Sequence, residues 1–147
     1  MRRRPRWVLH TAQKRPVTPD GAPASVSDSA TWSPWSTVRR RPMKGFMLGD
    51  GIGCIDLDHC LVDGAPTPAA AAFLAQVPET YIETSPSGDG LHVWGLLPEG
   101  AGSRRTVDGL AVETYSRERY ITVTEQPYRG APPILADLTP LLALVGR

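Results

Sequence analysis

The sequence predicts an α+β domain in which short strands form a sheet flanked by a few short helices. The 147 residues include 15 prolines and 14 glycines, more than a typical globular chain carries, so we expect many turns and short elements. Apolar runs typical of strands recur between residues 7 and 124, whereas only three short stretches have a helical pattern. The length suits one domain with a substantial hydrophobic core.

We expect residues 1–147 to form a single domain with four parts. These are a basic tail (1–6), a small basic αβ unit (7–48), a core that carries the site (49–125), and a C-terminal link with a helix (126–147). No run of about 18 apolar residues could span a membrane, and the basic start is not followed by the apolar segment of a signal peptide. These features predict a protein of the cytoplasm.

Charge is distributed unevenly along the chain. Residues 1–45 contain ten Lys or Arg against two Asp, a net charge of +8, and residues 46–147 contain six against thirteen acids, a net charge of −7. This asymmetry favours a polyanionic partner beside a cation-binding centre. A disordered basic tail on an ordinary acidic surface would produce the same asymmetry, so charge alone does not decide.

The two cysteines raise the question of a zinc site. Cys54 and Cys60 lie six positions apart with His59 between them. A second ligand pair at zinc-site spacing is missing and Cys54 falls within an apolar run, so we expect two reduced, structural thiols.

The basic αβ unit begins with a strand over residues 7–11 and a loop over 13–21 that is rich in proline and glycine. Ser33 as N-cap and Pro34 at the first helical position then predict a helix that reaches about Arg40. Trp32, Trp35 and Val38 repeat every three residues and would form its buried face. Core packing explains these aromatic residues better than stacking on nucleic-acid bases does.

Residues 46–48 and 52–57 are predicted to be two strands of a hairpin, joined by the tight turn Gly49-Asp-Gly51. The glycines of this turn superficially resemble a phosphate-binding loop. Dinucleotide and P-loop motifs need a helix directly after their glycines, whereas a strand follows here, so we exclude that interpretation.

The remaining elements follow in order along the chain. We expect a helix at 69–76, strands at 81–84 and 91–95, a flexible loop at 99–106, a strand at 110–115 with a hairpin partner at 117–124, and a short apolar helix at 139–145.

Two aspartates on one predicted strand are the first candidate site. Side chains alternate along a strand, so Asp56 and Asp58 share one face while Ile55 and Leu57 occupy the other. Aspartate is rare in strands, and two neighbouring carboxylates repel each other unless a cation lies between them. The pair therefore indicates a cation site, or else the exposed end of an edge strand.

The turn before the strand at 91–95 is the second candidate site. Gly88 and Gly90 leave its backbone open enough for N–H groups to approach an anion, Ser87 adds a hydroxyl donor, and His92 follows on the strand. A lone histidine in a strand is usually structural. One that follows a Ser-Gly-x-Gly turn is a better candidate for a phosphate contact.

The order of these motifs resembles the primase-polymerase domain of the archaeo-eukaryotic primase superfamily, of the bifunctional type found in phage and plasmid replication proteins. The resemblance covers about residues 7–125 and rests on three segments: Gly51-Ile-Gly-Cys-Ile-Asp-Leu-Asp-His-Cys60, Ser85-Pro-Ser-Gly-Asp-Gly-Leu-His-Val-Trp-Gly95, and Val112-Glu-Thr-Tyr115 followed by Arg119-Tyr120 and Thr122. The three-part order is far more specific than any one of these motifs.

The resemblance implies an RRM-like, mixed or antiparallel sheet that carries a two-metal centre for nucleotidyl transfer. By this carry-over, Asp56, Asp58 and Glu113 would hold two Mg²⁺ or Mn²⁺ ions, and His92 would complete the catalytic set. Nucleoside triphosphates, as NTP or dNTP, would be gripped by Ser87, Gly88, Gly90, His92 and Arg119. A single-stranded DNA template would follow basic residues of the N-terminal unit: Lys14, Arg15, Arg39, Arg40, Arg41 and Lys44.

The function implied is that of a DNA primase/polymerase of a phage or mobile element, which synthesises or extends a primer in the cytoplasm of its host. The chain is short for this family and lacks a Walker motif, so we expect a separate replicative helicase as partner. Two alternatives stay open: a non-catalytic single-strand-binding accessory module with a primase-like fold, and a metal-dependent enzyme acting on a small nucleotide.

Overall fold

The computed structural model describes residues 1–146 and confirms the α+β class, with three sheets and few helices. The small sheet has the strand order β11 (Tyr120–Val123), β3 (Lys44–Met47), β1 (Trp7–His10) and β2 (Pro16–Val17). The large sheet has the order β12 (Ala136–Asp137), β8 (Leu91–Leu96), β4 (Ile52–Asp58), β10 (Leu110–Tyr115) and β9 (Ser103–Val107), with β7 (Ile82–Thr84) also paired to β8. All pairings are antiparallel except that of β12 with β8. Residue 147, the last of the predicted C-terminal segment, lies outside the described residues.

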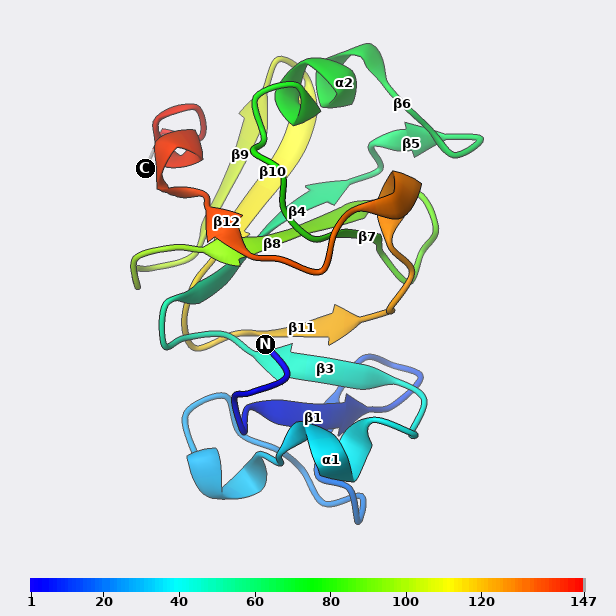
Figure 1. Cartoon of the computed structure of the whole chain (residues 1–147), viewed down its shortest axis with the longest axis vertical. Helices are drawn as coiled ribbons and strands as arrows, with labels where there is room; N and C mark the ends of the chain where they lie inside the picture. The colour runs from blue at the N-terminus through cyan, green and yellow to red at the C-terminus, as the bar shows by residue number, and fades with distance from the viewer. Residues whose placement is uncertain (147) are drawn as a thin grey trace.

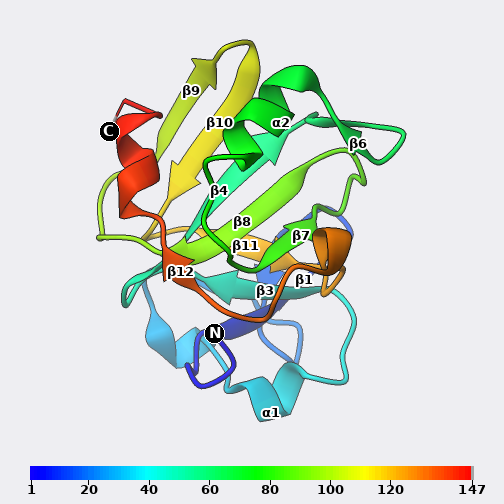
Figure 2. The same cartoon turned by 45° about the horizontal axis from the view of Figure 1, so that its top comes forward.

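The two larger sheets are stacked one above the other, and the two α-helices lie on their outer sides (Figures 1 and 2). Helix α1 (Trp35–Val38) covers the small sheet, and α2 (Pro68–Leu74) covers the large one. A two-stranded hairpin, β5 (Leu61–Val62) with β6 (Ala65–Pro66), precedes α2. Three 3-10 helices complete the chain: η1 (Ser29–Thr31), η2 (Tyr128–Gly130) and η3 (Thr139–Ala143). None of the helices within residues 1–146 is long and apolar enough to cross a membrane.

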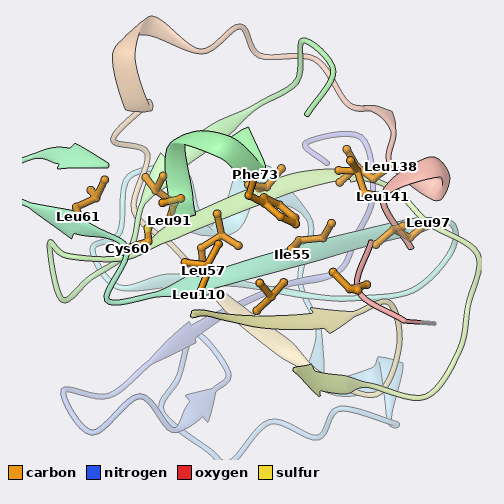
Figure 3. Close-up of a cluster of buried hydrophobic side chains, with 14 residues drawn as sticks. Ile55, Leu57, Cys60, Leu61, Phe73, Leu91, Leu97, Leu110, Leu138 and Leu141 are labelled. Atoms are coloured by element: carbon orange, nitrogen blue, oxygen red, sulfur yellow. The ribbon is translucent and has the colours of Figure 1, made fainter. Parts of the chain in front are cut away.

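The first core lies between α2 and one face of the large sheet. Ile55 and Leu57 of β4 point into it, as the alternation along this strand predicts, and Phe73 of α2 packs there (Figure 3). Leu141 and Val145 from the C-terminal segment close the same core. Full burial of such side chains stabilises the fold by about 1.5–3 kcal/mol each.

The second core lies between the two larger sheets and buries the opposite face of β4. Cys54 of β4 and Trp94 of β8 pack there against aromatic side chains of the small sheet, and the Phe46 and Trp94 ring centroids are 6.2 Å apart. Both cysteines are free and buried, which confirms the expectation of structural thiols. Asp56 is the next residue after Cys54 on this face of β4. The packed interface therefore ends at Cys54, and polar side chains begin at Asp56.

The hairpin expected at residues 46–57 is wrong. The tight turn itself forms, because Gly49 and Ile52 exchange two backbone hydrogen bonds of 3.1 Å and Gly51 has a φ of 78°. The strands on either side of the turn nevertheless belong to different sheets. Strands β1 and β11 pair with the two edges of β3, so β3 has no free edge left for β4. Strand β4 pairs with β8 and β10 instead.

The hairpin expected between residues 110–115 and 117–124 is wrong for the same reason. Strand β10 lies between β4 and β9, so β11 joins β3 of the small sheet. The second half of the stretch expected to be a loop, 99–106, belongs to β9, which forms a hairpin with β10 through Asp108 and Gly109. Their φ angles are 49° and 86°, the combination that a two-residue Asp-Gly hairpin turn requires.

The first two predicted helices are present as α-helices but are shorter than expected, and the third, at 139–145, is the 3-10 helix η3. Helix α1 ends at Val38 rather than near Arg40, and its N-cap is Pro34 rather than Ser33. Ser33 is unable to cap because its backbone pairs with Trp7, through hydrogen bonds of 2.8 and 3.0 Å. Helix α2 is capped by the Thr67 hydroxyl, which accepts a hydrogen bond from the N–H of Ala70.

Candidate active site

A row of five charged or ionisable side chains crosses the large sheet from one edge to the other. Neighbouring strands place their members directly opposite each other in register: Glu83 of β7, His92 of β8, Asp56 of β4, Glu113 of β10 and Arg104 of β9. Directly opposed residues share a face of the sheet, so their side chains are neighbours. We refer to these five residues as the transverse row.

Asp56 occupies the centre of the transverse row. Its side chain is 19% exposed, and its Oδ1 lies 3.8 Å from Nε2 of His92. Burial raises the pKa of this carboxyl, and the nearby carboxylates of Asp58 and Glu113 raise it further, against the opposing effect of His92. Asp56 is therefore a carboxylate that a positive charge would stabilise.

Asp58 lies two residues further along the same face, at the exposed end of β4. The turn that joins β7 to β8 approaches this end closely. A Cβ atom on Gly90 would lie 2.9 Å from the carbonyl oxygen of Leu57, so only glycine permits the approach. The two candidate sites that the sequence indicates are therefore adjacent in the structure.

The turn carries its own hydrogen-bond network. Ser87 donates to Asp89 over 2.5 Å, and its hydroxyl lies 2.9 Å from that of Ser85. Asp89 in turn lies 2.6 Å from Nδ1 of His59, a hydrogen bond that raises the pKa of His59. Gly88 has a φ of 84° and faces open space, and its N–H donates to the carbonyl of Ser85. A ligand that used Ser87 would therefore exchange its present bond to Asp89 for one to the ligand.

Glu113 is buried and has two partners within the sheet. Its carboxylate pairs with the guanidinium of Arg104 and accepts a hydrogen bond of 2.5 Å from the hydroxyl of Tyr115. Arg104 is mostly exposed, whereas only 5% of the Glu113 side chain is accessible. The predicted third metal ligand thus lies beside Asp56 but is held by an arginine and a tyrosine.

Arg119 lies beside the same group of acids. Its guanidinium carbon stacks 4.5 Å from the centroid of the Tyr115 ring, and its charge offsets a small part of the rise in the pKa of Asp56 that burial causes. The structure therefore places Arg119 near the acids, and its contact with a nucleotide stays a prediction.

The predicted template-binding cations lie elsewhere and differ in accessibility. Lys14 and Arg15 are exposed in the turn between β1 and β2, and residues 39–41 are exposed after α1. Lys44, in contrast, is buried, with its Nζ 2.7 Å from Glu125 and 2.8 Å from a backbone carbonyl. The accessible cations of this set are thus those in the two loops.

Asp56 and Asp58 are the residues that could hold a hard divalent cation. They are oxygen donors on one face, and the raised pKa of Asp56 reflects, in part, the repulsion between their charges. Within residues 1–146, no group of three or more His, Cys, Asp or Glu side chains is arranged to hold a metal ion. The third donor would be Glu113, whose carboxylate would have to exchange Arg104 or Tyr115 for the metal.

Sequence reasoning missed three functional candidates in this region: Glu83, Arg104 and Tyr115. Each lies within the transverse row or hydrogen-bonds to it. The Asp108-Gly109 turn was a usable signal for Arg104, because it predicts that β9 returns alongside β10. Glu83 gave the weaker signal of an acid within a strand run.

Two comparisons with known proteins indicate the family of this chain. Residues 4–133 match the model of a family described as bifunctional DNA primase/polymerase, N-terminal. The chain is also 32% identical, over 142 aligned residues, to the DNA primase-polymerase of Nitratiruptor phage NrS-1, with 87% of this chain and 20% of that protein covered. The chain therefore spans about a fifth of the length of this relative. On this match, the chain belongs to the bifunctional DNA primase/polymerase family.

Proposed function

We propose that this domain catalyses template-directed nucleotidyl transfer to DNA, to synthesise or extend a primer. The observation that carries the proposal is the pair Asp56 and Asp58 on one face of β4, flanked in register by His92 and Glu113. A module that only binds DNA has no need of a buried carboxylate whose neighbours repel it.

Asp56 and Asp58 would bind divalent cations, Mg²⁺ or Mn²⁺, with Glu113 as a third donor. Two such ions, when bound, supply positive charge that stabilises the attacking 3′-hydroxyl oxygen and the leaving pyrophosphate. Asp56 contributes a rigid donor, because both neighbouring strands fix its position, and Asp58 contributes a donor accessible to solvent. Glu113 joins them when it exchanges its bond to Arg104, which is exposed enough to move away.

The turn beside Asp58 would hold the triphosphate of the incoming NTP or dNTP. Ser87 offers a hydroxyl, Gly88 faces open space that a phosphate could approach, Gly90 lets the turn lie against the end of β4, and His92 presents Nε2 toward the same face. Arg119 adds a positive charge near the acids. The turn borders the acids, so a bound triphosphate would lie next to the proposed cations.

A single-stranded DNA template would be held mainly through its phosphates. The accessible cations Lys14, Arg15 and Arg39 to Arg41 lie in two loops of the small sheet and provide an electrostatic surface without base recognition. We expect Lys44 to contribute least, because its ammonium group is already paired with Glu125. Nucleotides and template meet in the cytoplasm of a host cell, where we place the reaction.

A primer-extension assay tests this proposal. The 147-residue chain is given a primed single-stranded template, labelled NTP or dNTP, and Mg²⁺ or Mn²⁺. The double variant Asp56→Asn/Asp58→Asn should lose incorporation, because it removes the charge and keeps the volume. The matched control is Asp63→Asn, the same change at an exposed acid in the turn between β5 and β6. Incorporation by a folded double variant would show that the site is assigned wrongly.

One observation favours a second candidate, a non-catalytic single-strand-binding module. Glu113 is fully paired with Arg104 and Tyr115, as it would be if its role were structural. This candidate predicts DNA binding with steep salt dependence and no incorporation with any metal. The same assay, run beside a binding titration, separates the two.

The match covers 20% of the relative from phage NrS-1, so the activity of that whole protein does not carry over to this chain. Priming without a primer, and cooperation with a replicative helicase, therefore stay predictions for this protein. An assay on an unprimed template checks the first, and a helicase-stimulated extension assay checks the second.

A further inference from the structure

Glu83 is a buried acid that the proposed reaction does not use directly. It lies in β7, at one end of the transverse row, and its side chain is completely buried. An isolated carboxylate in such a place would be costly, so its partners show what it does.

The carboxylate of Glu83 has five hydrogen-bonding neighbours. Oε2 accepts from the Tyr81 hydroxyl at 2.9 Å and from the backbone N–H groups of Thr124 at 3.1 Å and Glu125 at 3.0 Å. Oε1 lies 3.2 Å from the indole nitrogen of Trp94 and 3.3 Å from Nδ1 of His92. Indole and backbone N–H groups can only donate, so Glu83 acts as an acceptor on both oxygens.

This arrangement favours one tautomer and one orientation of the His92 ring. When Nδ1 carries the hydrogen it can donate to the Glu83 carboxylate, and the ring is then held by a bond at one nitrogen and by strand pairing on both sides. The other nitrogen, Nε2, is left toward the site, 3.8 Å from Asp56. Carboxylates that hold the far nitrogen of a functional histidine have this effect in other enzymes.

We propose that Glu83 is a positioning residue that holds the proton on Nδ1 of His92 and directs Nε2 toward Asp56 and the nucleotide. The part of this inference that concerns the nucleotide rests on the proposed function. The part that concerns the His92 ring does not.

A purely structural role is the competing explanation. Glu83 also joins β7 to the backbone at Thr124 and Glu125, and so links the large sheet to the segment that follows β11. Loss of activity in a Glu83 variant would therefore not by itself distinguish the two roles, and the test must observe the imidazole directly.

The first experiment is a long-range ¹H–¹⁵N NMR spectrum of the imidazole groups in the whole chain. The sequence has three histidines, so His92→Gln assigns the His92 signals by their disappearance. We expect a protonated Nδ1 in the wild-type chain. An unprotonated Nδ1 would overturn the proposal, even if no variant of Glu83 folds.

Glu83→Gln gives the sharper test because it keeps the shape of the side chain. Three donors face Oε2, so the amide oxygen must turn to them and the amide NH₂ must face Nδ1 of His92. Nδ1 then becomes the acceptor, and the proton should move to Nε2. Tyr81→Phe is the matched control, since it removes one partner of Glu83 and leaves the bond to His92. A proton that stays on Nδ1 in a folded Glu83→Gln variant would refute the proposal.

The second experiment uses primer extension and a double variant. Glu83→Gln should lower kcat/KM for the incoming nucleotide by about 10- to 100-fold, the range found for partners of functional histidines. In the His92→Gln variant, adding Glu83→Gln should not lower kcat/KM any further, because Glu83 acts through His92. An equal loss in both backgrounds would assign Glu83 a structural role. If the wild-type chain incorporates no nucleotide, the proposed function fails, and the NMR result still decides the role of Glu83.

Discussion

Divalent cations should stabilise the wild-type domain but not the Asp56→Asn variant. The variant should therefore be the more stable of the two without metal and the less stable with it. Without metal, the wild-type chain must keep a buried carboxylate next to Asp58 and Glu113, which is the reason that its pKa is raised. The asparagine of the variant has no charge to bury, so the variant should then be the more stable of the two. With Mg²⁺ or Mn²⁺ the wild-type chain gains binding free energy that the variant lacks.

The size of the gain follows from linkage. A ligand that binds only the folded state adds RT ln(1 + [L]/Kd), which is about 1.4 kcal/mol for about 10 mM metal and a Kd of about 1 mM. For a chain of this length, about 1 kcal/mol shifts Tm by about 2–4 °C, so the wild-type Tm should rise by about 3–6 °C. The Asp56→Asn curve should stay nearly flat, and the two curves should cross within the titration.

Thermal unfolding followed by circular dichroism measures both curves. KCl at equal ionic strength serves as the blank, a chelator should reverse the shift, and Asp63→Asn should follow the wild-type curve. If Asp56→Asn gains as much from Mn²⁺ as the wild-type chain does, the cation binds elsewhere and the reasoning about β4 is refuted.

Three further predictions concern charge and packing. Because the folded state raises the pKa of Asp56 above its usual value of 3.8, the folded chain holds more protons than the unfolded chain just above that pH. Urea titrations without metal measure the free energy of unfolding of the wild-type chain and of Asp56→Asn. The wild-type value minus the variant value should fall as pH rises from about 4 through the folded pKa of Asp56. A difference that does not change with pH would contradict this. Lys14→Ala and Arg40→Ala should each reduce, by about 0.7, the slope of the logarithm of the single-stranded DNA binding constant against the logarithm of salt concentration. Filter binding at several salt concentrations measures this slope. An unchanged slope would show that the residue does not contact the template. Phe73→Ala should cost about 3–5 kcal/mol in urea unfolding, because it opens a cavity between α2 and the sheet, and a loss below about 1 kcal/mol would show that α2 packs only loosely.

The faces of β4 were predictable from the sequence because they depend on local alternation alone. Ile55 and Leu57 are buried in the first core, and Asp56 and Asp58 share the opposite face, as period-two alternation requires. The adjacency of the Ser87 turn to these acids was suggested only by the resemblance to a known family. In the structure it depends on Gly90, whose missing side chain lets the turn reach the end of β4.

The pairing of strands was not predictable by the same reasoning. Each strand has two edges, and local sequence does not say which other strands will pair with those edges. The turn at Gly49 has the residues of a hairpin turn and forms one, but β1 and β11 already occupy the edges of β3. Residues 117–124 follow β10 closely, but β9 and β4 already occupy its edges. In both cases the tertiary competition for backbone hydrogen bonds decided the pairing.

Strand pairing also decides where the negative charge of the site remains uncompensated. Glu113 is neutralised by Arg104 and Glu83 is surrounded by donors, so both ends of the transverse row are satisfied within the protein. Asp56 forms no close ion pair within residues 1–146, where His92 approaches it only to 3.8 Å and Arg119 acts on it weakly, and Asp58 forms none. The uncompensated charge is thus concentrated on β4, beside the turn that we propose as the phosphate site. A cation bound there would be shared between the protein and an incoming triphosphate, so metal and nucleotide should each increase the affinity of the domain for the other.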